Sequence, residues 1–203
     1  MKLYMIRHGE TDWNVAKRFQ GRSDIPLNEE GRRLARVTSE ALRETHFTRI
    51  YTSPLKRAYE TAMIIKRDRN IPVINEPRII EISFGEYEGL CCSKENYNIP
   101  DPEFMNFFDK PEAYKPPKGA ESIEQLKMRT ADFLQEIVHN KTMENDTILV
   151  STHGAALRGI LSGINNVRIE DFWKGGVHKN CAVTIVEVKN GQAFIIEEGK
   201  TYY

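Results

Sequence analysis

The feature that most constrains the fold is a short apolar run that stops at three polar or small residues. Leu3 to Ile6 are apolar, and Arg7, His8 and Gly9 follow directly. Such a bounded run is typical of a buried strand, expected here over residues 2–7. In open α/β sheets, ligands collect at the carboxyl ends of the strands. We therefore expect Arg7 and His8 at a ligand site, where a cation beside a nucleophilic imidazole suits a phosphoryl group.

Short β-type runs alternate along the chain with longer helical patterns, which favours an α/β fold with a mainly parallel sheet and helices on its faces. Strands are expected at residues 2–7, 49–52, 147–152, 182–188 and 193–197. The third of these is followed by His153 and Gly154, which repeats the arrangement at the start of the chain. Asn190 and Gly191 tolerate a positive φ, so the last two strands are predicted to form a hairpin at an antiparallel edge.

Capping residues predict where the first long helices begin. Asn28 is expected to cap a helix with one apolar stripe, formed by Leu34, Val37, Ala41 and Leu42. Ser53, followed by Pro54 at the first helical position, is expected to open a helix that runs through Lys66. Arg57 would lie in the first turns of that helix.

Two further helices are expected in the second half of the chain. Ser122 and Gln125 have capping-box spacing, and the helix after them should end near His139. Its apolar face is predicted to hold Ile123, Leu126, Thr130, Phe133, Leu134, Ile137 and Val138. A helix of small residues is expected over residues 155–161.

Bulk composition limits the classes of function. The chain has 203 residues, so we expect a single domain over residues 1–203. Lys and Arg number 29, as do Asp and Glu, and this zero net charge gives no reason to expect a nucleic-acid or membrane partner. The three cysteines lack metal-type spacing, and reduced thiols together with the short N-terminal apolar run predict a cytoplasmic protein.

The least regular stretch is residues 90–120, which contains five prolines. Its aromatic residues are Tyr97, Phe104, Phe107, Phe108 and Tyr114. Loops of this length are usually functional or disordered, and the aromatic side chains favour a folded cover. We interpret the segment as a lid-like insertion that faces the substrate; the alternative is an excursion that only packs on the sheet.

Parallel neighbouring strands would bring Arg7, His8, Arg57 and His153 to one edge of the sheet. Guanidinium groups hold phosphate oxygens through paired hydrogen bonds, so this site requires no metal ion. A neutral imidazole can then attack phosphorus and form a phosphohistidine that water hydrolyses. Neighbouring arginines are expected to depress the pKa of His8 and keep its imidazole unprotonated.

The leaving alkoxide needs a proton, and the candidate donor is Glu81. Nearby arginines favour the ionised carboxyl, whereas a bound phosphate dianion favours the protonated one. The acid is therefore expected to be assembled when substrate binds. The residues alone do not choose Glu81 over Glu86 or Glu88.

The remaining histidines give no sign of chemistry. His46 and His139 fall at expected helix ends, where a cation suits the helix dipole, and His178 lies in a glycine-rich loop. We assign none of them a catalytic role. Neither H-x-H nor H-E-x-x-H spacing occurs, which disfavours a metal hydrolase.

Five blocks follow one another along nearly the whole chain, at residues 7–14, 19–27, 52–58, 81–89 and 151–154. The first opens with Arg-His-Gly-Glu-Thr. Together they resemble the histidine phosphatase superfamily, in its phosphoglycerate mutase-like branch. The resemblance implies a three-layer α/β/α sandwich that needs no metal for catalysis, with substrate-selecting residues in the insertion at 90–120. For a phosphatase of this kind we expect no cofactor.

The resemblance also implies roles for individual residues. His8 would be the phosphorylated nucleophile, and Arg7, Arg57 and His153 would form the phosphate pocket. Glu81 would be the proton donor. The positions that help to hold the phosphate or substrate are matched by Asn14, Gln20 and Gly21.

Members of this branch are mutases or phosphatases, and two features favour a phosphatase. The chain has Gln20 where glycolytic mutases typically carry Thr, and no arginine lies between Arg78 and Arg129, where mutases carry an arginine pair for the substrate carboxylate. The lysines of the insertion supply charge but no bidentate fork: Lys94, Lys110, Lys115 and Lys118. The chain resembles the broad-specificity and α-ribazole phosphate phosphatases most.

Three functions follow for testing. The first is a metal-independent phosphatase acting on a small phosphorylated metabolite, the second a cofactor-dependent phosphoglycerate mutase, and the third a non-catalytic module that binds a phosphorylated ligand. The physiological substrate stays open. A homodimer through the edge hairpin is possible, although Lys189 and the charged run at 197–200 discourage strand pairing.

Overall fold

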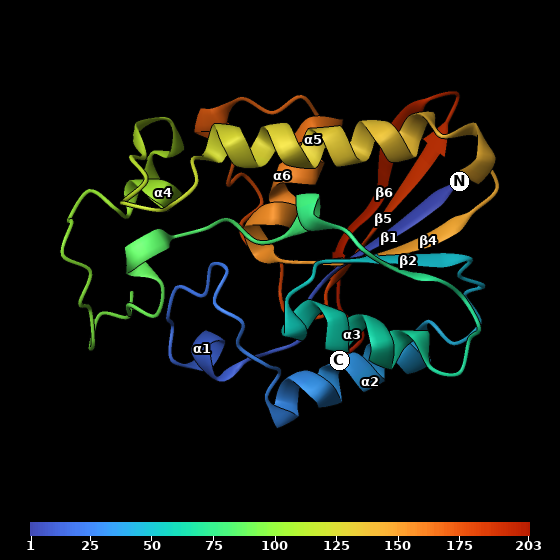
Figure 1. Ribbon diagram of the computed structural model, residues 1–203, viewed down its shortest axis with the longest axis horizontal. Helices are drawn as coiled ribbons and strands as arrows, with labels where there is room; N and C mark the ends of the chain where they lie inside the picture. Colours follow the sequence, from blue (N-terminus) through green and yellow to red (C-terminus); the bar gives the residue numbers. More distant parts are fainter.

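A six-stranded mixed sheet forms the centre of the computed structural model, which describes residues 1–203 (Figure 1). The strands are β1 (Lys2–Arg7), β2 (Arg49–Thr52), β3 (Val73–Asn75), β4 (Thr147–Thr152), β5 (Val183–Lys189) and β6 (Gln192–Lys200), in the spatial order β3-β2-β4-β1-β5-β6. The first four run parallel, and β5 and β6 are antiparallel to their neighbours. The predicted α/β class with an antiparallel edge is therefore confirmed.

Helices cover both faces of this sheet, which gives three layers. The α-helices are α1 (Asp12–Val15), α2 (Glu29–Ala41), α3 (Lys56–Lys66), α4 (Asn106–Asp109), α5 (Ile123–His139) and α6 (Gly154–Ile164). Short 3-10 helices span Pro77–Ile79, Gly85–Tyr87, Pro111–Ala113, Lys141–Met143 and Ile169–Asp171. In Figure 1, α5 and α6 lie on one face, and α2 and α3 on the other.

Side chains along each strand alternate between the two faces of the sheet, and each face carries a buried apolar core. Leu3 and Met5 of β1 point into one buried cluster with α5 and α6, whereas Ile6 points into a second cluster with α2 and α3. Adjacent side chains of a strand face opposite sides, so a run that is apolar throughout is buried on both. This is the reason that Leu3 to Ile6 show no polar position.

Two of the predicted caps form, and one apolar stripe was misplaced. Asn28 accepts the Gly31 amide hydrogen (2.8 Å) to begin α2, and the capping box at the start of α5 is present. All seven predicted apolar-face residues of α5 are buried. The stripe of α2 was wrong in part, because Ala41 is exposed and Val37 only half-buried, while Ala35 and Thr38 face the sheet.

The prediction that Ser53 caps α3 was wrong. The helix begins at Lys56, and its cap residue, Leu55, has an extended backbone without a side-chain cap. Ser53 instead follows directly after β2, and its hydroxyl lies 2.6 Å from Nε2 of His153. The chain bends at Pro54 and Leu55 before α3 begins. Other boundaries differ modestly: β3 was not predicted, and α6 and β6 each run three residues beyond the expected ends.

The segment 90–120 lies at the left of Figure 1, beyond the carboxyl ends of the parallel strands, and packs into an apolar cluster that it shares with the rest of the chain. Phe104, Phe107 and Tyr114 are buried in a third apolar cluster, whereas Tyr97 is exposed. Isolated bridges pair Arg18 with Cys91 and Phe84 with Ala120, so both ends of the segment are tied to the rest of the chain.

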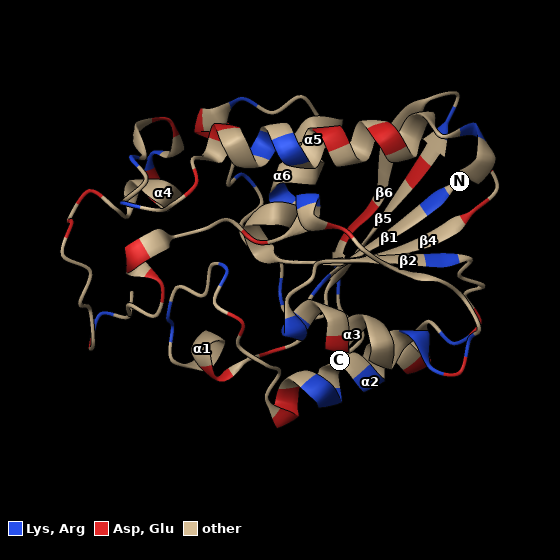
Figure 2. Cartoon of the chain, in the orientation of Figure 1, with Lys and Arg blue, Asp and Glu red and all other residues tan.

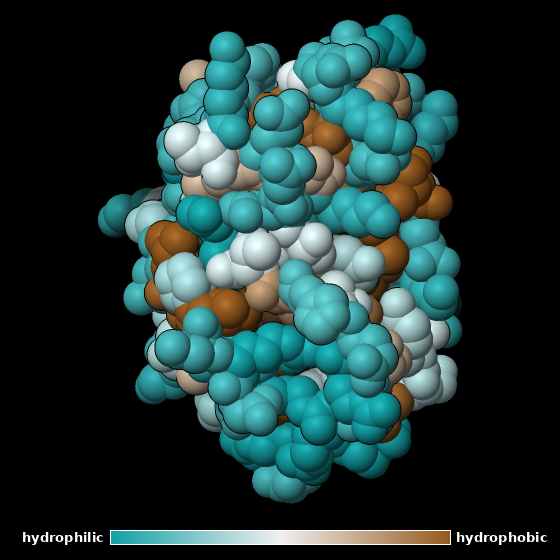
Figure 3. Space-filling model, turned by 90° about the vertical axis from the view of Figure 1, so that its right-hand side faces the viewer, coloured by the Kyte–Doolittle hydropathy of each residue, from teal (hydrophilic) through white to brown (hydrophobic).

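Charges of both signs alternate over the surface, as Figure 2 shows for α2 and α5. The end of the molecule that carries the N-terminus is mainly hydrophilic, with separate small apolar areas (Figure 3). None of the helices combines the length and the apolar character needed to cross a membrane.

Candidate active site

The carboxyl ends of β1, β2 and β4 bring the predicted cationic and imidazole side chains together. His8 and His153 lie with their ring centroids 5.1 Å apart. The Nε of Arg57, from the first turn of α3, donates to Nε2 of His8 over 3.3 Å. Arg7 and Glu81 line the same cavity as His8 and Arg57. One cavity is therefore lined by Arg7, His8, Arg57 and Glu81, whereas His153 packs against the ring of His8 and does not line it.

His8 is presented as a neutral imidazole whose Nε2 lone pair accepts a hydrogen bond from Arg57. Its Nδ1 lies 2.6 Å from the carbonyl oxygen of Gly9, a contact that requires a proton on Nδ1. Nε2 is consequently unprotonated. Burial lowers the pKa of His8 well below its usual value, and the nearby cations Arg57 and Arg7 lower it further. The site thus holds its nucleophilic nitrogen ready without an added base.

The buried neutral histidines predict a loss of stability in mild acid. The pKa values of His8 and His153 are both well below 6.5, so below about pH 6.5 the unfolded chain binds protons that the folded chain does not. The free energy of unfolding should then fall by about 1.4 kcal/mol per pH unit for each histidine. Urea unfolding at pH 7.5, 6.5 and 5.5 measures this slope.

A variant isolates the contribution of one ring to this slope. His8→Gln removes one of the two depressed groups, so its stability should fall less steeply below pH 6.5 than that of the wild type, by about one proton. His139→Gln, at the exposed end of α5, serves as the matched control. Equal stability of the wild type at pH 7.5 and 5.5 would contradict the prediction.

Arg57 is held rigidly by the turn that follows Gln20. The side chain is fully buried, and its Nη1 and Nη2 donate to the carbonyl oxygens of Ser23 and Gly21, each over 2.7 Å. Burial lowers the pKa of Arg57 to about 10, which leaves it charged at neutral pH. Gly21 has φ +52°, and a Cβ there would meet the carboxylate of Glu88 at 2.2 Å. Only glycine can form this turn without displacing its neighbours.

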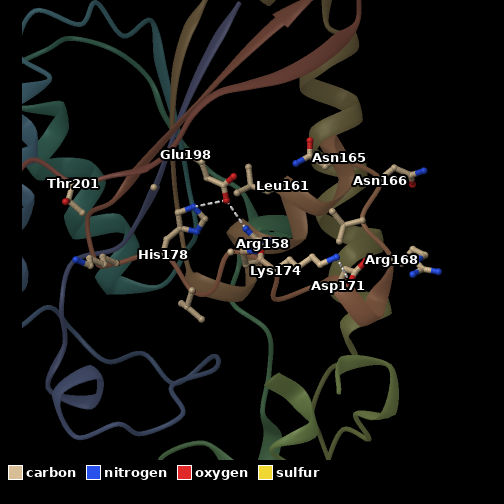
Figure 4. A pocket seen from close by; sticks show the side chains of 15 residues that line it. Arg158, Leu161, Asn165, Asn166, Arg168, Asp171, Lys174, His178, Glu198 and Thr201 are labelled. Carbon is tan, nitrogen blue, oxygen red and sulfur yellow. Dashed lines mark hydrogen bonds and ion pairs between the residues drawn. The ribbon is translucent and has the colours of Figure 1, made fainter. Parts of the chain in front are cut away.

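Arg7 is anchored from the opposite side, through a loop that the sequence did not mark. Its Nη1 donates to the main-chain carbonyl of His178 over 2.5 Å. The His178 ring is buried beside Thr184 (3.2 Å) and Glu198 (3.5 Å). Figure 4 shows Glu198 between His178 and Arg158, on the wall of an open groove of about 840 Å³. His178 therefore contributes to the site through its backbone position and not through its ring.

His153 follows β4 directly and precedes α6. Its Nε2 lies 2.6 Å from the hydroxyl of Ser53, and its Nδ1 is buried without a partner in the protein. Burial lowers the pKa of His153 well below its usual value, and Arg57 adds to this effect. A neutral ring with one unused nitrogen can serve a bound oxyanion as a hydrogen-bond donor.

The structure separates the three candidate acids. Glu81 lines the cavity, and its carboxylate accepts from the amides of Ala155 (3.2 Å) and Ala156 (3.0 Å) at the start of α6. Glu86 is exposed. Glu88 accepts from the amide of Arg22 (2.9 Å) and from both the amide and the hydroxyl of Ser23, so it organises the turn below Arg57. Of the three, Glu81 is the one placed to exchange a proton with a ligand.

The predicted phosphate-holding residues after His8 also face the cavity. Asn14, Gln20 and Gly21 line it. The side-chain oxygen of Asn14 accepts from the Thr11 amide (3.1 Å), which orients the residue by the capping box of α1. Gln20 is buried, and its oxygen has no partner in the protein. Both amides retain hydrogen-bonding capacity for a ligand.

The cavity measures about 260 Å³, and two walls of it extend beyond the residues predicted to bind phosphate. One is aromatic, formed by Trp13, Phe19, Phe84, Phe107, Phe108 and Trp173. The other is cationic, formed by Lys17 and Arg18. Lys17 and Arg18 lie in the sequence between Asn14 and Gln20, and this position could have indicated that they line the cavity. None of the four insertion lysines lines the cavity. At this cavity these lysines therefore do not supply even the charge of the mutase arginines.

Comparison with known proteins identifies the architecture. The family model of the histidine phosphatase superfamily (branch 1) matches residues 3–200. Phosphoserine phosphatase 1 of Hydrogenobacter thermophilus is 31% identical, over 97% of this chain and 91% of that protein. A metal-independent phosphoserine phosphatase of Arabidopsis thaliana is 34% identical, over 97% and 79%. The solved structure of Bacillus stearothermophilus YhfR superimposes with a TM-score of 0.90 at 34% identity, covering 98% and 97% of the two chains.

Mutases are present among the relatives as well. A 2,3-bisphosphoglycerate-dependent phosphoglycerate mutase of Gloeobacter violaceus is 30% identical, over 85% of this chain and 79% of that protein. The two phosphoserine phosphatases named above match a larger share of this chain than this mutase does.

Proposed function

The chain belongs to the histidine phosphatase superfamily, branch 1, and is a phosphatase; we propose that His8 carries the phosphoryl group during hydrolysis of a small phosphomonoester. The observation that carries this proposal is the unprotonated Nε2 of His8 beside the buried guanidinium of Arg57. We take residues 1–203 as one catalytic domain, with residues 90–120 facing the substrate. The relatives' names point to substrates of the phosphoserine and phosphoglycerate type.

In the first step, the lone pair on Nε2 of His8 attacks phosphorus while the bond to the leaving oxygen breaks. Arg7 and Arg57, which line the cavity, hold the non-bridging oxygens, and His153 supports the ring of His8 from behind the cavity. Protonated Glu81 gives its proton to the leaving alkoxide. The products are an alcohol and a phosphohistidine.

In the second step, water attacks the phosphohistidine. Glu81, now ionised, accepts the proton of that water as the new P–O bond forms and the P–N bond breaks. The electron pair returns to Nε2, and inorganic phosphate leaves. The same cationic residues stabilise the charge in both steps, so no metal ion takes part in the scheme.

Trapping of the intermediate tests the proposal. An aryl phosphate labelled in its phosphoryl group, quenched rapidly in base, should leave label on the protein that is stable in alkali and lost in acid. Turnover should persist in chelator. Label on a residue other than His8, or turnover that chelator abolishes, would contradict the proposed chemistry.

Replacement of Glu81 should separate substrates by their leaving groups. In Glu81→Gln, the single-turnover release of the alcohol from an alkyl phosphate should slow by roughly 10²–10³-fold, because the alkoxide lacks its proton donor. Release of nitrophenolate, which leaves without a proton, should slow by less than about tenfold. Glu86→Gln changes an exposed carboxylate and is the control. An equal decrease in the release rate for both substrates would show that Glu81 is not the general acid.

A phosphoglycerate mutase is the competing function, because mutases occur among the relatives. The absence of insertion cations from the cavity speaks against it. Following 3-phosphoglycerate with 2,3-bisphosphoglycerate present distinguishes the two, since a mutase forms 2-phosphoglycerate faster than phosphate. A non-catalytic binder would bind phosphate but form no phosphohistidine.

A further inference from the structure

Asn180 is a polar residue beside the active site that the proposed mechanism does not use. It lies in the loop before β5, the strand that pairs with β1. Its side-chain Nδ2 donates to the main-chain carbonyl of His8 over 3.0 Å and to Oδ1 of Asn14 over 3.4 Å. Asn180 does not line the cavity. Any effect it has on a ligand must therefore act through the residues that it contacts.

The amide of Asn180 joins two segments that carry different parts of the site. An amide nitrogen has two hydrogens, and the two acceptors here belong to different segments. His8 follows β1 and holds the nucleophilic nitrogen, whereas Asn14 lies in α1 and lines the cavity. The two hydrogen bonds therefore fix the nucleophile relative to a residue of the phosphate pocket.

Oδ1 of Asn14 is occupied within the protein, which leaves Nδ2 of the same amide for a ligand. Oδ1 accepts from the amide and the hydroxyl of Thr11, each over 3.1 Å, and from Asn180. Nδ2 of Asn14 takes part in none of the hydrogen bonds of the structure. Because Asn14 lines the cavity, this group can donate to a phosphate oxygen. Asn180 and Thr11 together thus determine which end of the Asn14 amide serves the ligand.

The backbone next to Asn180 has a costly conformation. Cys181 has φ +56°, in the left-handed region that residues other than glycine seldom adopt. The amide of Cys181 donates to the carbonyl of Arg7 over 2.9 Å, and the carbonyl of Asn180 accepts from the hydroxyl of Tyr203 over 2.6 Å. Partial burial raises the pKa of Tyr203, so its hydroxyl keeps its proton at neutral pH. Such strain persists only where surrounding contacts impose it, and these contacts hold Asn180 against the end of β1.

From these contacts we infer that Asn180, fixed by the hydroxyl of Tyr203, is a positioning residue that holds His8 and Asn14 in place relative to each other. The inference rests on the proposed function and adds to it two residues outside the cavity. The bond to the His8 carbonyl should affect the rate of phosphoryl transfer, because it sets the position of the nucleophile. The bond to Asn14 should affect phosphate affinity, because it orients a donor of the pocket.

Calorimetric titration with inorganic phosphate tests the contact with Asn14. In Asn180→Ala the Kd for phosphate should rise about fivefold, as expected for one lost neutral hydrogen bond. In the Asn14→Ala background, the same replacement should change Kd by less than about twofold, because the contact is already absent. Misfolded protein lowers the number of binding sites but not the affinity of the remaining ones, so Kd separates positioning from stability. A fivefold effect in both backgrounds would overturn the link through Asn14.

The rate of nitrophenolate release in a single turnover, at saturating substrate, tests the contact with His8. In Asn180→Ala this rate should fall about tenfold, because the nucleophile loses a contact that fixes its backbone. The same decrease should appear in the Asn14→Ala background, since the His8 contact is lost in both. An unchanged rate would overturn the link through His8.

Milder and matched variants keep the test independent of folding. Tyr203→Phe removes one hydroxyl from an exposed residue and should raise the phosphate Kd about threefold, because the backbone of Asn180 loses a hydrogen bond. Tyr202→Phe, whose hydroxyl makes none of the hydrogen bonds of the structure, should keep the wild-type Kd. Asn145→Ala changes an exposed asparagine before β4 and should also have no effect. Wild-type Kd and rate in both Asn180→Ala and Tyr203→Phe would refute the inference.

Phosphate binding requires no turnover, so this inference and the proposed function can fail separately. If the wild type forms no phosphohistidine but Asn180→Ala weakens phosphate binding only when Asn14 is present, the proposed chemistry fails and the role of Asn180 stands. If the phosphohistidine forms on His8 but Asn180→Ala keeps the wild-type Kd and rate, the chemistry stands and the role of Asn180 fails.

Discussion

Replacement of His8 by glutamine should lower kcat by roughly 10⁵-fold or more, because the phosphoryl group then has no nitrogen to accept it. Glutamine keeps a polar group beside the Arg57 guanidinium and brings no charge into a buried position. The variant should therefore fold and still bind phosphate. Steady-state hydrolysis of an aryl phosphate measures the loss, and alkaline quenching should recover no labelled protein.

Thermal unfolding of the same variant distinguishes lost chemistry from lost structure. A melting temperature near that of the wild type, with activity absent, supports His8 as the nucleophile. His139→Gln, which changes an exposed histidine at the end of α5, should leave both quantities unchanged. Residual activity of His8→Gln within a hundredfold of the wild type would mean that another group attacks phosphorus.

Replacement of Arg57 by glutamine should affect both activity and stability. Catalysis should fall by about 10³-fold in kcat/KM, because the guanidinium beside the nucleophile neutralises charge on the transferring group. The free energy of unfolding should fall by about 2 kcal/mol, because the carbonyls of Gly21 and Ser23 lose their donors. Enzyme kinetics and urea unfolding at pH 7.5 measure the two effects.

The conservative variant sharpens this test. Arg57→Lys keeps a charge but cannot donate to Gly21, Ser23 and a phosphate oxygen from one planar group. Its kcat/KM should therefore stay at least about a hundredfold below that of the wild type. Arg36→Gln alters an exposed arginine of α2 and provides the control. Full activity in Arg57→Lys would show that charge alone suffices.

The sequence predicted the features that depend on neighbouring residues. β1 and β4 are continuous apolar runs, and each is followed by a histidine and a glycine, so their boundaries and the position of both imidazoles follow from local pattern. The helix caps at Asn28 and Ser122 depend on residues three positions apart. Parallel pairing of β1 with β4, and of β4 with β2, then brings the strand ends together.

Features that depend on distant contacts were not predictable in this way. Ser53 has the residue type of a helix cap, yet it lies against His153, one hundred positions away. The choice of Glu81 over Glu88 depends on which carboxylate reaches α6 and which reaches the turn at Ser23. Lys17 lines the cavity with a backbone φ of +51°, a conformation that no sequence pattern indicates for a lysine.

Phe107 belongs both to the cavity wall and to an apolar core, and this limits how the substrate preference of the enzyme can evolve. Phe107 lines the cavity and is also buried in the third apolar cluster, where its ring centroid lies 5.1 Å from those of Phe84 and Tyr114. A mutation there would change substrate choice and folding together, and selection would remove most such changes before their benefit could spread. Phe108 and Lys17 are less buried and free of this constraint. New substrate preferences in this lineage should therefore arise by drift at the rim, while Phe107 stays under purifying selection.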